Sequence, residues 1–574
     1  GSSRGKKKKN ETKETQANMK FSSHMLVGIV APLLLSINAS PEIISGEWYS
    51  CVCKSATDSH CEVVKGKDIH GALAVGIYRD TGNETGWGEL WIETSTTDDD
   101  SFFAAGFLEG VLTKQRIVQH YKSWYSTTFT DSKPLQNETI NFIMDQYEFT
   151  NELVRKNVGN DDDGYYKRLG GLMRQMHGIL DGINIEHVHM TLLDILLLQA
   201  AGDLYDIIPA TKPSEYKLDV NKLNASEFRK EWHRVVSCSA LIKMSDDRND
   251  IFAGHTTWST YENMLRIFKN YNLGGSTVSF SAKPGLLYSK DDFYVVTSMK
   301  QRLVVIETTN GIMDKEMYKL ITPQSLQTWQ RIPVANTLAV SGKTWTTTFA
   351  RYNSGTYANQ WMVLDLKKFV PGTGCSAKDC LWVIEVAPGI AEAADVTPVF
   401  KAQGNHWPSM NVPYFEKVYN ASGFRAAYEK YGDQYSYTQC PRCKIFRRDQ
   451  SSVQNETSIR KILRYNDYEH DPLSKGNPGN AISSRNDLAK NPTAFGGIDT
   501  KVTSFSRMAS NGLLGIVAAQ NGPTHDQLPA FSWSGSGLAK DHLHLGQPDT
   551  FDFGFVDMFV QPQKPRWYPI AEPA

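Results

Sequence analysis

The residue whose type and setting most suggest chemistry is Cys238, in the stretch V-V-S-C-S-A-L-I-K. The apolar run Ala240–Met244 predicts a short strand, and Ser245–Asp250, rich in Asp and Asn, predicts a turn. A second strand is expected over Ile251–Thr257, and it carries His255. A thiol that begins a hairpin, with a His on the returning strand, suits a nucleophile. It equally suits an ordinary buried cysteine, because free Cys is among the most buried residue types.

Trp258 follows this hairpin and leads into a segment that is predicted to be helical. Ser259–Lys269 has three apolar side chains on one side at helical spacing, Met264, Leu265 and Phe268. Without further information, His255 would be a satisfied buried histidine and Trp258 a core residue.

Two H-x-H pairs, His187–His189 and His542–His544, are the candidate metal ligands, with Glu186 and Asp541 beside them. Zinc sites do use His and carboxylate ligands. An H-x-H pair points both rings to one face on a strand but not on a helix, and the first pair abuts a predicted helix. Because no H-E-x-x-H motif occurs either, the sequence disfavours a metal hydrolase, and neither a metal nor a cofactor is predicted.

The composition is that of a globular protein with a sizeable core. The chain has 574 residues, of which 40% are hydrophobic and 21% charged, enough for one large or two ordinary domains. The formal net charge is −1, so there is no electrostatic case for a nucleic-acid partner.

The N-terminal region has the pattern of a secretory leader. Residues 1–18 are polar and are set aside as upstream sequence or a cloning remnant. Residues 19–39 are predicted to be a signal peptide, with Lys20, a short apolar run over 25–35 and a small residue before Ser40. That run is too short to span a bilayer, which needs ~20 residues, so a membrane anchor is the weaker interpretation.

Five N-x-S/T sites after this leader suit a glycoprotein that enters the secretory route: Asn83, Asn137, Asn224, Asn420 and Asn455. A location in the lysosomal lumen or outside the cell is therefore expected.

The eight cysteines include a cluster and two close pairs: Cys51, Cys53 and Cys61, then Cys375 with Cys380 and Cys440 with Cys443. In an oxidising compartment the close pairs are expected to be disulfides. C-P-R-C at Cys440 could instead be redox-active, but no thioredoxin-like βαβ pattern surrounds it, so a structural bond is predicted. Cys238 has no other cysteine near it in the sequence.

The elements around Cys238 change in type along the chain. Short β-rich runs between Gly46 and Glu93 precede helices expected over 102–125, 140–158, 163–183 and 190–205, and 206–230 is a polar connector. After Cys238, strands are expected over 276–281, 293–298, 303–308, 360–366, 381–387, 502–507 and 514–519, with helices over 323–334, 344–352 and 412–431. The polar segment 466–492 is predicted to be a long surface loop. Strands with helices segregated around them indicate an α+β layered fold.

Several of these stretches resemble the phospholipase B-like family of lysosomal or secreted hydrolases. They are C-S-A-L-I-K, H-T-T-W and Y-E-N-M-L-R-I-F-K near Cys238, then A-A-G-F-L-E-G-V-L-T, N-S-G-T-Y-A-N-Q-W-M-V, K-I-F-R-R, L-R-Y-N-D-Y-E-H-D-P-L-S, G-G-I-D-T-K-V-T-S and H-L-G-Q-P-D. The matches run from about Trp48 to Phe553, nearly the whole chain after the leader.

The resemblance implies a fold and a maturation step. The family is similar in fold to the N-terminal nucleophile hydrolases, which are α+β, four-layer αββα sandwiches, here with a largely helical N-terminal portion. Those enzymes cut their own chain directly before the nucleophile. The cut would divide the mature chain into 40–237 and 238–574, both parts of one compact unit.

The resemblance also implies the residues around the nucleophile: catalytic Cys238, Asn411 and Arg442, and substrate-binding His255, Trp258, Thr308 and Thr309. Asn411 suits an oxyanion donor, and the planar fork of Arg442 suits orienting the nucleophile or meeting a phosphate. Asn411 could instead cap a helix, and Arg442 could be a structural ion-pair partner. A disulfide between Cys440 and Cys443 could also shift the backbone of Arg442.

A cut before Cys238 would place an α-amine beside the thiol, so that one residue supplies both nucleophile and base. The family name implies release of fatty acids from glycerophospholipids, with contact at the membrane periphery. An amidase acting on N-acyl lipids or peptide-like amides is an alternative, and so is a glycoprotein with weak or no activity, since fold does not fix function. The oligomeric state stays open.

Overall fold

Two β-sheets carry most of the residues predicted to form the site. The computed structural model describes residues 1, 42–53, 61–185, 188–216, 220, 222–225, 227–228, 238–290, 292–510 and 512–562. The predicted leader and signal peptide lie outside these ranges, Gly1 apart, and so does the stretch 229–237 directly before Cys238. Residues 40–574 form one compact unit.

The larger sheet has eleven strands in the order β15-β14-β11-β10-β9-β8-β7-β4-β3-β1-β2. They are β1 (Trp48–Cys53), β2 (Cys61–Lys65), β3 (Ala74–Thr81), β4 (Trp87–Thr94), β7 (Arg266–Leu273), β8 (Thr277–Ala282), β9 (Phe293–Thr297), β10 (Arg302–Thr309), β11 (Asn359–Asp365), β14 (Leu381–Ala387) and β15 (Ile390–Asp395). Neighbours pair antiparallel except β4 and β7, which run parallel from Trp87 opposite Arg266 to Thr94 opposite Leu273. Because β4 precedes Cys238 and β7 follows it, both parts of the chain belong to one sheet.

The smaller sheet has six strands in the order β16-β5-β6-β17-β18-β21, all antiparallel to their neighbours. They are β16 (His406–Ser409), β5 (Ser239–Met244), β6 (Ile251–Thr260), β17 (Phe495–Ser504), β18 (Val517–Asn521) and β21 (Val556–Met558). The hairpin of β5 and β6, with its turn, is as predicted, and it pairs Ala240 with His255. Two short ladders complete the strands: β12 (Phe369–Val370) with β13 (Gly374–Cys375), and β19 (Phe531–Ser532) with β20 (Thr550–Phe551).

Strand β5 is buried on both faces, which explains its unbroken apolar sequence. On one face Ala240 and Ile242 join a core with Val304 and Ile306 of β10, from the larger sheet. On the other face Leu241 joins a core formed with helices α13 (Pro441–Asp449) and α14 (Glu456–Leu463). Full burial of a side chain of the size of Leu241 or Ile242 stabilises the fold by about 1.5–3 kcal/mol.

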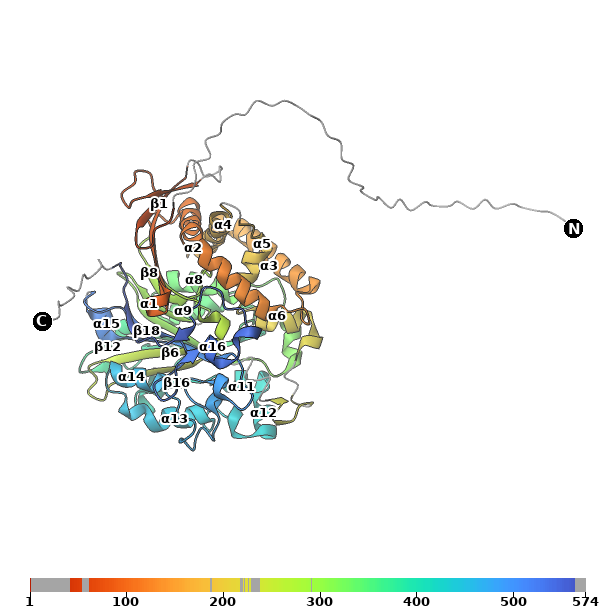
Figure 1. Ribbon diagram of the computed structural model, residues 1–574, viewed down its shortest axis with the longest axis vertical. Coiled ribbons are helices and arrows are strands. Elements are labelled where there is room, and N and C mark those ends of the chain that lie inside the picture. The colour runs from red at the N-terminus through yellow and green to blue at the C-terminus, as the bar shows by residue number, and fades with distance from the viewer. Residues whose placement is uncertain are drawn as a thin grey trace, which may run out of the picture. The chain divides into compact units, whose positions relative to one another are not determined.

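Helices pack on the face of the larger sheet that is turned away from the smaller sheet, and among them α2 and α4 have the most extensive contact. They are α2 (Asp99–Thr128), α3 (Asn137–Asn157), α4 (Tyr165–Ile183), α5 (Leu192–Gln199), α6 (Leu204–Thr211), α8 (Thr328–Leu338) and α9 (Gly342–Ala350). A Cβ on Gly178 would lie 2.1 Å from the Phe103 carbonyl oxygen, so α2 and α4 approach through glycine. Figure 1 shows α2, α3 and α4 on one side of the strands and α13 and α14 on the other.

The remaining helices are short: α1 (Gly82–Thr85), α10 (Thr397–Ala402), α11 (Glu416–Ala421), α12 (Phe424–Tyr431), α15 (Phe505–Ala509) and α16 (Trp533–Ser536). The observed elements confirm the mixed α+β class, with helices before Cys238 and strands dominant after it.

Several predictions about elements are wrong. Residues 259–269 are not a helix: β6 ends at Thr260, a 3-10 turn covers Tyr261–Met264, and β7 begins at Arg266. Pairing of β7 with β4 and β8 overrides the helical spacing of its apolar residues. The expected helix over 190–205 is split into α5 and α6, and α6 extends into the predicted connector. The expected helix over 412–431 is likewise split, into α11 and α12. The expected strand over 502–507 ends at Ser504 with β17, and α15 follows directly.

The segment 466–492 is not a surface loop. It contains 3-10 turns at Pro478–Asn480 and Asn486–Leu488 and buries polar residues such as Asn466 and Arg485. The Nη1 atom of Arg485 donates to the carbonyl oxygens of Thr524 at 2.6 Å and Pro529 at 2.8 Å. Internal hydrogen bonds of this kind allow a Gly-, Asn- and Ser-rich segment to be buried.

Candidate active site

Cys238 lies directly before β5 and is only 1% exposed. Its φ angle is 95°, in the left-handed region that non-glycine residues rarely adopt, so its backbone is strained. The Cys238 sulfur, a ring nitrogen of His255 and a carboxylate oxygen of Glu307 all lie within 4.8 Å of one another. The prediction that His255 faces Cys238 is consistent with this geometry.

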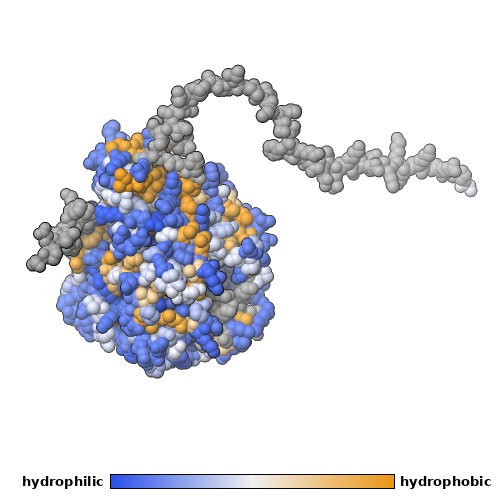
Figure 2. Space-filling model, viewed as in Figure 1, coloured by the Kyte–Doolittle hydropathy of each residue, from blue (hydrophilic) through white to orange (hydrophobic). Residues whose placement is uncertain are grey.

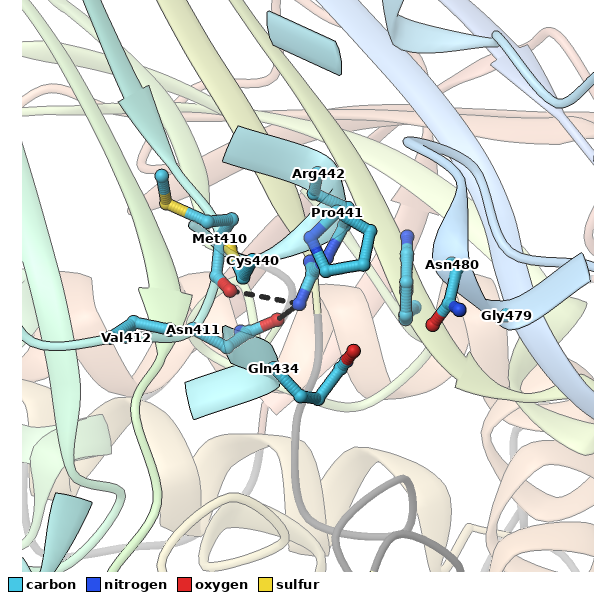
Figure 3. A pocket seen from close by; sticks show the side chains of 10 residues that line it. Met410, Asn411, Val412, Gln434, Cys440, Pro441, Arg442, Gly479 and Asn480 are labelled. Carbon is cyan, nitrogen blue, oxygen red and sulfur yellow. Dashed lines mark hydrogen bonds between the residues drawn. The ribbon is translucent and has the colours of Figure 1, made fainter. Parts of the chain in front are cut away.

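Arg442 holds the backbone at Cys238. Its Nη1 atom donates to the Cys238 carbonyl oxygen at 2.7 Å and to Ser239 Oγ at 3.1 Å. Its Nη2 atom donates to the Met410 carbonyl oxygen at 2.8 Å and to Asn411 Oδ1 at 2.7 Å (Figure 3). Burial lowers the pKa of Arg442 to about 10, so the guanidinium stays charged at neutral pH. These acceptors are all neutral oxygens. Arg442 therefore positions the groups that it bonds and does not form an ion pair with them.

Asn411 links Arg442 to the end of β10. Its Nδ2 donates to the Thr309 carbonyl oxygen at 2.6 Å, while its Oδ1 accepts from Arg442. Its φ angle is 68°, which Asn tolerates better than most residues. Asn411 does not cap a helix, because the next one, α11, has Phe415 at its N-cap.

Trp258 and the two threonines lie around this pair. The guanidinium carbon of Arg442 is 4.4 Å from the centroid of the Trp258 ring. The Trp258 Nε1 donates to the Ile482 carbonyl oxygen at 3.0 Å, and Ser239 Oγ donates to the same oxygen at 2.8 Å. Thr308 Oγ1 lies 2.6 Å from Ser409 Oγ, two residues before Asn411. The segment 466–492 thus supplies a carbonyl that orients the site.

A small cavity beside Arg442 is lined by Trp258, Met410, Asn411, Val412, Gln434, Cys440, Pro441, Arg442, Gly479 and Asn480 (Figure 3). Its volume is about 10 Å³, room for roughly one water molecule. Any larger ligand would therefore need this cavity to open.

Glu307 and Tyr357 belong to the site but were not predicted. The Tyr357 hydroxyl lies 3.1 Å from Glu307 Oε1 and 2.7 Å from Asp292 Oδ2. Burial, then the charges of Asp292, Glu307 and Cys238, raise the pKa of Tyr357 well above its usual value, so the phenol keeps its proton. The available signal was a glutamate inside an apolar strand, V-V-I-E-T-T.

A buried charge network lies behind His255. Its Nδ1 is 3.5 Å from Thr257 Oγ1, which accepts a hydrogen bond from Lys501. Asp499 Oδ1 pairs with Lys501 Nζ at 2.5 Å, and Asp499 Oδ2 pairs with Arg266 Nη2 at 2.9 Å. Through Thr257, these paired charges lie next to the ring of His255.

The cysteines correct one prediction. Cys375 and Cys380 form the predicted disulfide, and Cys53 pairs with Cys61. Cys440 and Cys443 carry thiols that are not joined, contrary to the prediction. Cys440 is the N-cap of α13, and burial raises its pKa to about 12, so it holds a protonated thiol of low reactivity.

The H-x-H pairs do not form a metal cluster among the described residues. His187 and Glu186 of the first pair lie outside those residues. His542 Nδ1 contacts Glu262 Oε1, whereas the His544 ring stacks on Trp533 with centroids 4.1 Å apart. The two rings are thus held by different partners.

The five N-x-S/T asparagines all have exposed side chains. Hydrophilic residues cover much of the face shown in Figure 2, with hydrophobic patches between them, as on most folded proteins. Among the described residues, no helix has the length and apolar character needed to cross a bilayer.

Sequence comparison places the chain in a family. A profile described as Phospholipase B matches residues 74–558. The chain belongs to the phospholipase B family. The family match covers the candidate site residues, from β3 through β21.

Relatives from this family match over most of their own lengths. Phospholipase B-like protein B of Dictyostelium discoideum is 39% identical over 496 residues, 82% of this chain and 83% of the relative. Phospholipase B-like 1 of Homo sapiens is 36% identical over 540 residues, 91% of this chain and 93% of the relative. The protein of the same name from Bos taurus is 36% identical over 545 residues, with coverage of 92% and 95%.

Proposed function

We propose that this chain is a lipid acyl hydrolase whose nucleophile is Cys238, exposed as a new N-terminus by a self-catalysed cut. The observation that carries the proposal is the position of Cys238. It is a strained residue directly before β5, with its carbonyl held by Arg442 and its thiol near His255 and Glu307. Membership of the phospholipase B family and the names of the relatives support phospholipids as the substrate class.

The layers support an N-terminal nucleophile fold. Cores lie between helices and the larger sheet, between the two sheets, and between the smaller sheet and α13 and α14. We propose that these are the layers of an αββα sandwich in which residues 40–237 and 238–574 remain together after the cut. The parallel pairing of β4 with β7 would hold them.

The proposed cut uses the Cys238 thiol on the carbonyl carbon of Ser237, which lies outside the described residues. Sulfur forms a bond to that carbon, the peptide C–N bond breaks, and the nitrogen leaves as the amine of Cys238. Water then adds to the thioester, which releases the Ser237 carboxylate and returns the thiol. Strain at the φ of Cys238 would be relieved in this step.

Turnover would use the same atoms. The α-amine, with a reference pKa of ~7.7–8.0, takes the thiol proton, and the thiolate attacks the acyl carbonyl. The ammonium returns that proton to the departing alcohol, and water activated by the amine hydrolyses the thioester. Asn411 Nδ2, released from Thr309, would donate to the oxyanion, while Arg442 keeps Cys238 in place.

The proposed setting is the lysosomal lumen or the extracellular space, reached through the signal peptide at 19–39. Five exposed N-x-S/T asparagines support glycosylation on that route. The substrate would be met at the periphery of a membrane.

Intact-mass and N-terminal analysis of the secreted protein test the cut. We expect a fragment that begins at Cys238, and a Cys238→Ala chain that stays whole. The processed protein is then assayed with diacyl glycerophospholipids, lysophospholipids and N-acyl amides.

Fatty acid release from the phospholipids, abolished by Cys238→Ala, supports the proposal. Release from amides alone would make the protein an amidase. A cut protein that hydrolyses none of these substrates would be a glycoprotein without this activity, and an unbroken chain through 236–240 in an active protein would overturn the mechanism.

A further inference from the structure

The buried group formed by Cys238, His255 and Glu307 has the donors of a metal site. A sulfur, a ring nitrogen and a carboxylate oxygen lie within 4.8 Å of one another. Thiolate, imidazole and carboxylate together are ligands that Zn²⁺ accepts, and magnesium or calcium would prefer oxygen alone. We propose that these three residues bind Zn²⁺ and that the bound ion reversibly blocks the nucleophile.

The three donors come from separate elements that the fold holds together. Cys238 precedes β5, His255 lies on β6, and Glu307 lies on β10 of the other sheet. Zinc binds these atom types at about 2.0–2.3 Å, so tetrahedral donors lie roughly 3.5 Å apart. The observed limit of 4.8 Å requires side-chain movements of only about 1 Å to reach that spacing.

The partners of the ligands suit this role. Metal-binding carboxylates and histidines are oriented by groups that hydrogen-bond to their far side. The Tyr357 hydroxyl lies 3.1 Å from Glu307 Oε1, and Thr257 Oγ1 lies 3.5 Å from His255 Nδ1. Both partners are buried, so they would hold the two ligands in one orientation.

The fourth ligand depends on the cut, and this step rests on the proposed function. In an intact chain it would be water. In a cut chain the α-amine of Cys238 and its thiolate would close a five-membered chelate ring on the ion. Zinc would then occupy both the nucleophile and the base. The thiol proton passes to solvent on binding, so affinity should fall as the pH falls.

Zinc titration against a fluorescent zinc chelator tests the proposal with the full, processed protein. We expect one ion per chain and an affinity at least 10-fold weaker in His255→Gln and in Glu307→Gln. Loss of a residue that only hydrogen-bonds to a ligand lowers metal affinity by ~10–100-fold, and loss of the ligand itself should cost at least as much. Cys51→Ser and Cys440→Ser are the controls for other buried thiols and should bind zinc as the parent does. Circular dichroism and the melting temperature identify any variant that fails to fold.

Cobalt gives a measurement that needs no variant. Co²⁺ bound to the parent protein should show thiolate-to-metal charge-transfer absorption, lost on addition of zinc. Unchanged zinc affinity in both Gln variants, or no such absorption, would overturn the site. Fatty acid release without zinc binding would overturn only the site, whereas zinc binding through these residues by an inactive protein would overturn only the proposed function.

Discussion

Arg442 and Cys238, 204 residues apart, are joined by a hydrogen bond of 2.7 Å from Nη1 to the Cys238 carbonyl oxygen. The same guanidinium donates a hydrogen bond to Asn411, so one buried side chain fixes the proposed nucleophile and the proposed oxyanion donor together. The position of the thiol therefore depends on a residue of α13.

Replacement of Arg442 by Lys should slow the cut and lower fatty acid release by at least ~100-fold. A single ammonium group cannot donate to the four acceptors that the planar guanidinium of Arg442 reaches. Buried acceptors left without donors should cost on the order of 2 kcal/mol of unfolding free energy. Fragment yield on denaturing gels, kcat and the denaturant midpoint measure these effects. Lys444→Arg is the control, at a half-exposed position two residues later on the same helix, and this variant should be cut normally.

Asn411 allows its side chain and its backbone to be tested apart. Asn411→Gly keeps the φ of 68° without strain but removes the amide, so it should fold well and lose activity. Asn411→Ala removes the same amide and adds strain of about 1–2 kcal/mol, so it should have a lower melting temperature than the Gly variant. Equal activity in Asn411→Gly and the parent would show that the amide is not the oxyanion donor.

The buried pair of Glu109 and Lys269 joins the two parts of the chain on either side of the proposed cut. Lys269→Met should destabilise the protein by about 3–5 kcal/mol, because Glu109 is left buried without a counter-charge. The double variant Glu109→Gln with Lys269→Met should recover much of that loss. Denaturant unfolding of the parent, Glu109→Gln, Lys269→Met and the double variant measures this recovery, and additive losses in the double variant would contradict the coupling.

His542 should give a pH-dependent contribution to stability. Its hydrogen bond to Glu262 raises its pKa above the ordinary 6.5. The contribution is therefore complete below about pH 6.5 and is lost as the pH rises through the folded-state value. His542→Gln should lower the unfolding free energy on the order of 1 kcal/mol at pH 5 and by less at pH 9.

The control for this pH effect is His470→Gln, at an exposed histidine beside Asp467. It should change the melting temperature little at either pH, because solvent screens an exposed pair. A His542→Gln difference that stays constant from pH 5 to pH 9 would show that the histidine charge plays no part.

The contact of α2 and α4 should tolerate no added methyl group. Gly178→Ala would place Cβ 2.1 Å from the Phe103 carbonyl oxygen and should separate the helices, with a loss of about 1–3 kcal/mol. Gly159→Ala, where nothing lies within 4 Å of the new Cβ, should be neutral or slightly stabilising. Thermal unfolding compares the two, and equal melting temperatures would contradict the close contact.

Local sequence signals were enough to predict the structure around Cys238. The apolar run after Cys238, the Asp-rich turn and the returning strand with His255 predicted the β5–β6 hairpin, because strand and turn signals act over a few residues. The same local signals predicted α2, α3, α4 and most later strands, and motif similarity indicated the family and the residues around Cys238.

The surroundings of Cys238, in contrast, depend on contacts between distant parts of the chain. Residues 266–273 form a strand despite their helical spacing because β4, almost 180 residues upstream, is their parallel neighbour. Glu307 lies beside the thiol because β10 packs across from β5. The segment 466–492 is held against the site because the Ile482 carbonyl oxygen accepts hydrogen bonds from Trp258 and Ser239. Such contacts depend on how two sheets pack face to face, and spacing along one chain carries no record of that packing.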